Sequence, residues 1–175
     1  MPVTLNSRPA EDEYAPYYAG YIARVPDGDL CATLAAQLTE TRALVQAIPE
    51  ARGTHRYAPG KWSIKEVLGH VIDTERIMSY RALRFARADE TPLPGYEQND
   101  YVPPGGFDQR TLQDLSEELA AVRLATIHQL RHFDAAALAR RGTASGKQFS
   151  VRALAYIIAG HERHHVEILK AKYLA

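Results

Sequence analysis

The chain has 175 residues, of which 46% are hydrophobic, so its length and composition predict one folded domain and exclude a disordered chain. Its 21 lysine and arginine residues equal its 21 aspartate and glutamate residues, which excludes the overall positive field that would attract nucleic acid or an anionic membrane. The single cysteine excludes an internal disulfide, and neither a signal peptide nor a bilayer-length apolar run is visible, so we expect a cytoplasmic protein.

The first part of the chain predicts an arm followed by a helix. Residues 1–27 form a tyrosine-rich N-terminal arm, which we expect to pack on the rest of the domain. A first helix is predicted over residues 29–48, where apolar residues recur every three or four positions from Cys31 to Ile48. Pro49 follows and ends the pattern.

A second helix is predicted over residues 63–88. It begins with Ser-Ile-Lys-Glu, a capping box in which Ser63 caps the helix and Glu66 reaches back to it. Residues 89–110 follow and are rich in proline and glycine, so we expect an irregular crossover. A connection of this length lets the helices before and after it run in the same direction.

Two more helices complete the pattern, one over residues 111–133 and one from residue 150 to near the end of the chain. The stretch between them, residues 140–149, is predicted to be a loop. The sequence therefore predicts an all-α fold: one domain over residues 1–175, built as a four-helix bundle with a long crossover between its second and third helices.

Two histidines occupy the apolar face of the last predicted helix. His161 and His165 are one helical turn apart, and both fall within the arc of apolar residues from Val151 to Ile168, while His164 lies on its flank. Two imidazoles at this spacing can bind one metal ion. The alternative is a pair of core histidines that are hydrogen-bonded to their neighbours, because an unpartnered buried polar ring is costly.

A second pair with the same spacing serves as a comparison. His128 and His132 lie on the side of the third predicted helix that is opposite to its apolar residues. We expect them to face solvent, because spacing indicates a metal site only on a buried face.

A third ligand is expected from the second helix. His70 lies at the edge of its apolar face, and antiparallel packing with the last helix would bring it to the depth of His161 and His165. Glu75 and Asp73 could orient a ligand histidine by a hydrogen bond. Glu75 could equally be the partner of Arg76 or of another cation at the edge of the core.

The sequence His-Glu-Arg-His-His also contains H-E-x-x-H, the zinc protease motif, in which Glu162 would be the general base. We do not favour a protease, because only Glu167 among the ten residues that follow could supply a third ligand and no substrate-binding strand is predicted. Glu162 could still serve as a base on metal-bound water in another fold.

Residues 18–30, 57–102 and 149–169 together resemble the DinB/YfiT-like superfamily of four-helix-bundle metalloproteins. The specific part of the resemblance is one histidine in the second helix and H-x-x-x-H in the last, which here are His70, His161 and His165. The resemblance implies helices that run up-down-down-up and one divalent ion, zinc, nickel, iron or manganese, on three imidazoles. It also implies a homodimer and, as in relatives that use bacillithiol or mycothiol, a low-molecular-weight thiol as cosubstrate.

Three functions follow as hypotheses. The first is a metal-dependent S-transferase that joins a small thiol to an electrophilic small molecule, since a metal-bound thiol loses its proton. The second is a hydrolase that uses metal-bound hydroxide, and the third is a non-catalytic metal-binding stress-response protein. Neither nucleic acid nor membrane is an expected partner. Candidate residues of the substrate pocket, each of which could instead serve packing alone, are Tyr18, Tyr21, Trp62, Arg76, Tyr96, Glu97, Gln98, Asn99 and Tyr101.

Overall fold

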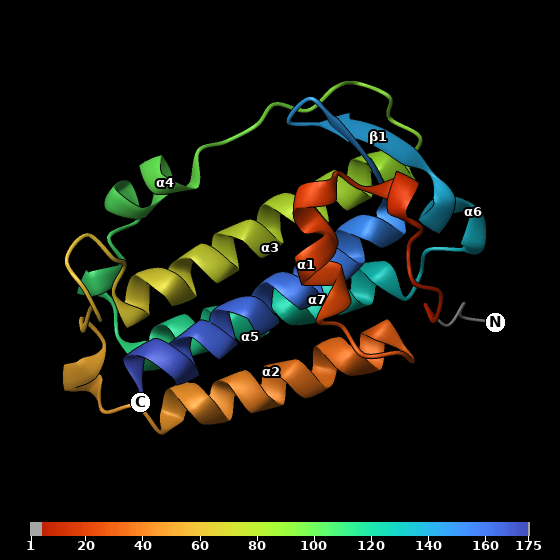
Figure 1. Cartoon of the computed structure of the whole chain (residues 1–175). Helices are drawn as coiled ribbons and strands as arrows, with labels where there is room; N and C mark the ends of the chain where they lie inside the picture. The colour runs from red at the N-terminus through yellow and green to blue at the C-terminus, as the bar shows by residue number, and fades with distance from the viewer. Residues whose placement is uncertain (1–4, 175) are drawn as a thin grey trace.

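Four long helices lie side by side in the computed structural model, which describes residues 5–174 (Figure 1). They are α2 (Leu30–Gln46), α3 (Ile64–Ala86), α5 (Leu112–Leu130) and α7 (Val151–Ile168). α3 and α5 run in one direction and α2 and α7 in the other, because the connection after α3 returns along the bundle before α5 begins. The predicted all-α four-helix bundle with a crossover between its second and third long helices is confirmed.

Each long helix begins where the sequence predicts, because a polar side chain accepts a hydrogen bond from a backbone N–H of the first turn. In the capping box of α3, the Ser63 hydroxyl accepts from the N–H of Glu66 at 3.0 Å, and the Glu66 carboxylate accepts from the N–H of Ser63 at 2.7 Å. The other three caps are Asp29, Thr111 and Ser150.

Shorter elements join and cover the bundle. They are η1 (Glu11–Glu13), η2 (Pro16–Tyr18), α1 (Ala19–Ala23), η3 (Glu50–Arg52), α4 (Gln98–Gly105), η4 (Phe107–Gln109), α6 (Ala135–Ala139), β1 (Arg141–Ala144), β2 (Lys147–Ser150) and the π-helical turn η5 (Leu169–Tyr173). None of the helices between residues 5 and 174 combines the length and the hydropathy that a bilayer crossing requires.

Two connections differ from the sequence-based expectation. The crossover is not irregular throughout, because it contains α4 and η4. The stretch predicted to be a loop over residues 140–149 is an antiparallel hairpin, β1 paired with β2. Its turn is made by Ser145 and Gly146, which both adopt a positive φ, at 52° and 70°. Strands of four residues are too short for alternation of apolar and polar side chains to reveal them.

The N-terminal arm packs on α7, as Figure 1 shows for α1. The contact is close because α7 carries Gly160 at this point: a Cβ added there would lie 2.0 Å from the carbonyl oxygen of Tyr21. Glu13 fixes the start of the arm, since its buried carboxylate accepts hydrogen bonds from Ser150 and Arg152. Residues 1–4, which belong to the predicted arm, lie outside the described residues.

The apolar core has two parts, with a buried polar layer between them. On α3, for example, one cluster takes residues 64–72 and the other takes residues 78–86. Polar side chains from all four long helices occupy the intervening level. They are Gln37, Thr41, Thr74, Glu75, Arg123, His161 and Glu162.

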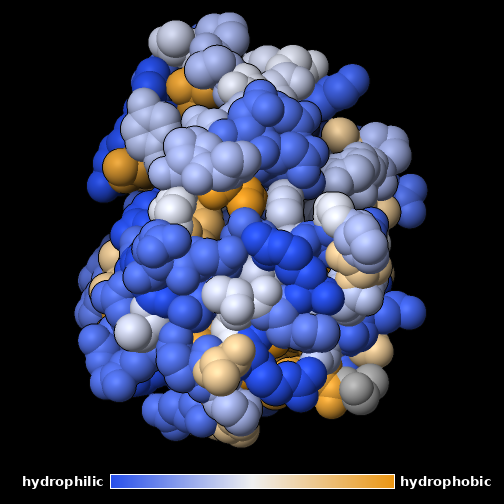
Figure 2. Space-filling model, turned by 90° about the vertical axis from the view of Figure 1, so that its left-hand side faces the viewer, coloured by the Kyte–Doolittle hydropathy of each residue, from blue (hydrophilic) through white to orange (hydrophobic). Residues whose placement is uncertain are grey.

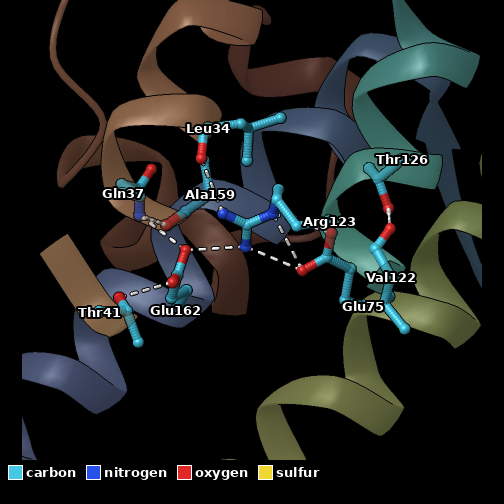
Figure 3. Close-up of polar contacts among 9 residues, drawn as sticks. All are labelled: Leu34, Gln37, Thr41, Glu75, Val122, Arg123, Thr126, Ala159 and Glu162. Atoms are coloured by element: carbon cyan, nitrogen blue, oxygen red, sulfur yellow. Dashed lines mark hydrogen bonds and ion pairs between the residues drawn. The ribbon is translucent and has the colours of Figure 1, made fainter. Parts of the chain in front are cut away.

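Arg123 is the centre of this layer, as Figure 3 shows. Its guanidinium binds Glu75 of α3 through two nitrogens, at 2.8 and 2.9 Å, and lies 2.7 Å from a carboxylate oxygen of Glu162 on α7. It also donates to the carbonyl oxygen of Leu34 on α2 at 3.1 Å. Burial alone lowers the pKa of Arg123, but the two carboxylates outweigh it and raise that pKa above its ordinary value. One side chain of α5 thus bonds to the other three helices.

We predict that Arg123→Met destabilises the fold by about 3–5 kcal/mol, because it leaves two buried carboxylates without their cation. Urea unfolding followed by circular dichroism measures the loss. The matched control is Arg76→Met, which removes an exposed arginine paired with Glu118 and should cost less than about 1 kcal/mol. Equal effects of the two substitutions would contradict the role given to Arg123.

Candidate metal centre

Three histidine rings converge between α3 and α7. The Nε2 atom of His161 lies 2.9 Å from Nε2 of His70 and 3.1 Å from Nε2 of His165. Within residues 5–174, these three form the group of potential metal ligands, and their ligand atoms all lie within 4.8 Å of one another. The structure therefore brings together the three histidines that the sequence singled out.

Antiparallel packing explains the convergence. His70 lies about 9 Å along the axis from the start of α3, and His165 and His161 lie about 4 and 10 Å from the end of α7. The neighbour of His70 on α3 is Gly69, where an added Cβ would lie 2.3 Å from the Phe107 ring. The end of the crossover can therefore pack directly against the helix beside His70.

Burial keeps the three rings neutral. It lowers the pKa of His70 to about 4 and that of His165 to about 3. The pKa of His161 falls well below its ordinary value, first through burial and then through the neighbouring imidazoles. Neutral imidazole is the form that binds a metal ion.

The spacing of the rings fits a shared cation better than hydrogen bonds among the rings alone. A neutral imidazole nitrogen either donates one hydrogen bond or accepts one, so Nε2 of His161 cannot satisfy both of its neighbours. One cation could accept a lone pair from each of the three Nε2 atoms. The nitrogens of a tetrahedral zinc site are about 3.3 Å apart, close to the two separations observed from Nε2 of His161.

Thr74 and Trp62 also contact the His70 ring. Nδ1 of His70 lies 3.5 Å from the hydroxyl of Thr74, which in turn lies 3.1 Å from the hydroxyl of Tyr96. The Trp62 ring packs against His70 at 4.7 Å between centroids. These contacts restrict the rotation of the imidazole and link it to the crossover that carries Tyr96.

Two cavities adjoin the three histidines. The larger, of about 380 Å³, is lined by His161, and the smaller, of about 230 Å³, is lined by His165. Asn99 of α4 lines both cavities, so α4 lies over the centre. Figure 2 views the end of the molecule that carries α4: its surface is mostly hydrophilic, and hydrophobic side chains show only in small patches, some inside a hollow. This end therefore offers access for polar small molecules more than a broad apolar surface for a protein partner.

Most of the predicted pocket residues lie around these cavities. The larger one is lined by Tyr18, Tyr21, Tyr96, Glu97, Gln98 and Asn99, and the smaller one by Trp62. Tyr101 is 47% exposed and packs on Tyr96 without lining either cavity. Arg76 faces away and pairs with Glu118, so its predicted place in the pocket was wrong.

The carboxylates have other roles than those predicted. The Glu162 carboxylate accepts hydrogen bonds from Thr41 and Gln37 and pairs with Arg123. It therefore does not lie where a base acting on metal-bound water would have to lie, and the prediction of that role was wrong. Glu75 also bonds to Arg123, which matches the alternative of a core cation as its partner. A hydrogen bond from a ligand histidine to Glu75 or Asp73 is absent from residues 5–174, and burial raises the pKa of Asp73.

His128, His132 and Glu167 are separate from the centre, whereas the His164 ring packs beside that of His165, at 5.1 Å between centroids. His128 and His132 are exposed, as predicted from their position opposite the apolar face of α5. His164 packs against the Tyr21 ring at 5.3 Å. Glu167, the residue that a zinc protease would have needed as a ligand, pairs with Arg24 on the surface.

The sequence interpretation missed several residues of the larger cavity. Thr74, Met78 and Arg81 continue from His70 at steps of four, four and three along α3, so they share its face. Extending the face of His70 along the helix would have identified them. Ser145 lies in the hairpin turn, and no sequence pattern placed it near α3.

Comparisons with known proteins agree with this geometry. Among curated protein sequences, none matches the chain. The fold is similar to that of YfiT from Bacillus subtilis, described as a probable metal-dependent hydrolase with an unusual four-helix bundle topology (TM-score 0.69, 15% identity, 96% of this chain and 97% of that one). It is also similar to a mycothiol-dependent maleylpyruvate isomerase (TM-score 0.66, 13% identity, 83% of this chain and 61% of that one). A sequence profile of the DinB superfamily matches residues 33–169, which include all three histidines, and the chain therefore belongs to the DinB superfamily.

Proposed function

We propose that the chain is a metal-dependent enzyme in which His70, His161 and His165 hold one divalent cation beside a small-molecule cavity. We further propose that it transfers a low-molecular-weight thiol to an electrophilic small molecule. The observation that carries the proposal is the convergence of three neutral imidazoles, of which His161 lines the 380 Å³ cavity and His165 the smaller one. Three protein ligands leave a coordination position for a substrate, as in catalytic metal sites.

The absence of a free carboxylate at the centre favours a thiol over water as the nucleophile. Among residues 5–174, no carboxylate shares the histidine cluster, and Glu162 is held by Arg123. A divalent cation held here would act as a Lewis acid that lowers the pKa of the group it binds. A thiol, with an ordinary pKa of about 8.5, needs less help to lose its proton than water, with about 15.7.

The chain's own residues would orient the reactants. Thr74 and Tyr96 hold the His70 ring, and the Tyr21 ring packs on His161 at 5.5 Å between centroids. In the transfer, the thiolate sulfur forms a bond to an electrophilic carbon, the leaving group departs with the electrons of the broken bond, and the thiol proton passes to solvent. Tyrosine rings along the cavity would shield the reacting atoms from water.

Metal-dependent hydrolysis is the second candidate. It is supported by the likeness to YfiT, described as a probable metal-dependent hydrolase, over nearly the full length of both chains. The homodimer expected from the family resemblance stays a prediction, for which sedimentation velocity is the direct measurement.

We predict that the purified chain binds one divalent cation per molecule, measured by elemental analysis after dialysis against zinc and then against buffer. The double variant His161→Asn/His165→Asn should retain none, because it removes two of three ligands. The double variant His128→Asn/His132→Asn has the same spacing on an exposed face and should bind as the wild type does. Equal metal contents in the two variants would refute the site.

We predict that the metal-loaded protein accelerates displacement of chloride from 1-chloro-2,4-dinitrobenzene by at least one of cysteine, bacillithiol and mycothiol. His165→Ala should reduce the rate to that without protein, because the nucleophile is no longer activated. Cleavage of 4-nitrophenyl acetate, assayed in parallel, tests the second candidate. Ester cleavage without any thiol transfer would overturn the first candidate in favour of the hydrolase.

We predict that the metal-free protein loses stability as the pH falls from about 6.5 to 4. The folded-state pKa of His70 is lowered to about 4, so the unfolded chain binds more protons than the folded chain in this window. Each buried histidine contributes up to about 1.4 kcal/mol per pH unit to this loss. Urea unfolding in chelator, at pH values from 4.5 to 7, measures the slope.

The His70→Asn variant should show a shallower slope over the same pH range, since one titrating ring is gone. His128→Asn, on the exposed face of α5, should leave the slope unchanged. The same slope in wild type and His70→Asn would contradict the burial of a neutral ring at this position.

A further inference from the structure

The larger cavity contains a buried cation that the proposed chemistry does not use. Arg81 of α3 is 3% exposed and lines the cavity, yet no carboxylate of residues 5–174 lies within 4.0 Å of its guanidinium. Its two oxygen acceptors are neutral: the carbonyl of Pro94 and the hydroxyl of Ser145, both 3.0 Å from Nη2. A buried charge without a counter-ion is costly, and burial lowers the pKa of Arg81.

The buried Arg123 and the partly buried Arg152 differ from Arg81 in this respect. Arg123 has two carboxylates, and Arg152 has the buried carboxylate of Glu13. Glu97, the acidic residue among those that line the larger cavity, is exposed, and its carboxylate caps the start of α4 by accepting from Asn99. The cavity wall therefore combines one buried positive charge with no buried negative charge.

The larger cavity extends along α3 from the level of the histidines to Arg81. Arg81 lies eleven residues, or about 16 Å, along α3 from His70, and its side chain leans back toward the start of the helix. Met78 and Ile157, which are 4% and 1% exposed, line the stretch between the two ends. The cavity thus has the imidazole of His161 at one end and the guanidinium of Arg81 at the other, with apolar side chains between them. The two ends are on the order of 10 Å apart once the length of the arginine side chain is subtracted.

We infer that Arg81 is an anion-binding subsite that receives the carboxylate of a small molecule whose other end reaches the three histidines. Arginine binds carboxylate by paired, charge-assisted hydrogen bonds, and in a buried pocket such a pair discriminates strongly against a neutral analogue. The Tyr96 ring, 5.9 Å from the guanidinium carbon, and Ser145 form the rest of this end. The inference rests on the proposed function for the second end of the ligand, while the subsite itself needs no metal.

The first experiment uses metal-free protein, so that it does not depend on the proposed function. Hexanoate and hexan-1-ol, which have the same chain length, are titrated into the full chain and followed by NMR. Hexanoate should bind at least tenfold more tightly than the alcohol, and the side-chain N–H signal of Arg81 should shift with the acid alone. Equal affinities, or an unshifted Arg81 signal, would overturn the subsite.

Variants of Arg81 distinguish the effect of its positive charge from the effect of its hydrogen bonds to Pro94 and Ser145. Arg81→Gln should bring the ratio of the two affinities close to one, whereas Arg81→Lys should keep a preference for the acid. Arg84→Gln is the matched control: this arginine is one turn further along α3, but it pairs with Asp89 outside the cavity, so the ratio should not change. If Arg81→Gln fails to fold, the wild-type signal of Arg81 and the lysine variant still decide the outcome.

The second experiment tests the distance between the two ends. Cobalt-loaded protein is titrated with 3-mercaptopropionate, 6-mercaptohexanoate and 8-mercaptooctanoate, each against the matching mercapto alcohol, and the thiolate-to-cobalt absorption band reports binding. The advantage of the acid should rise with chain length and vanish in Arg81→Gln. Failure of cobalt to bind would count against the metal centre alone, whereas thiol binding with no preference for the acids at any length would remove the inferred subsite alone.

Discussion

The ion pairs of Arg123 are the contact on which the rest of the structure depends. Glu75 lies five residues after His70 on α3, and Glu162 follows His161 directly on α7, so the buried arginine and the histidine centre are built on the same two helices. A slip of one helix by a single turn, about 5.4 Å, would break the ion pairs and separate the imidazoles together. Apolar contacts alone specify such a register weakly, because neighbouring turns of an apolar face are similar. The polar layer makes one alignment of α3 and α7 the favourable one.

The same polar layer keeps the buried carboxylates of Glu75 and Glu162 away from the three imidazoles. Both buried carboxylates at this level bond to the guanidinium, which leaves the three imidazoles without an acidic partner among the described residues. Each ring therefore stays neutral, and the Nε2 atoms of His70 and His165 both lie beside that of His161. The arrangement explains why a glutamate next to His161 in the sequence is not part of the site.

Local sequence patterns predicted the long helices and the histidine cluster, whereas features that depend on tertiary contacts were missed. Polar caps such as Ser63 and the 3.6-residue periodicity determine the helices locally, and the histidines were identifiable because they interrupt apolar faces. The partner of Glu162 was not identifiable, because Arg123 is about forty residues away in the chain and its place on α5 is set by packing. α4 and the hairpin β1–β2 are short, so few residues carry their signal, and both depend on contacts with α3 for their positions. Arg81 is buried under the crossover and the hairpin, through Pro94 and Ser145, and the sequence of α3 alone carries no signal of that cover.

The two ends of the larger cavity are built from different kinds of element. The histidine end lies on long helices whose alignment is fixed by buried ion pairs, while the Arg81 end is completed by the crossover through Pro94 and Tyr96 and by the hairpin turn through Ser145. Connections tolerate change in sequence and length better than a buried ion-pair layer does. A bundle of this design could therefore keep one metal chemistry while the crossover and the hairpin adapt the far end to different substrates. Within this chain, the choice of substrate would then lie in the connections, and the reactivity in the helices.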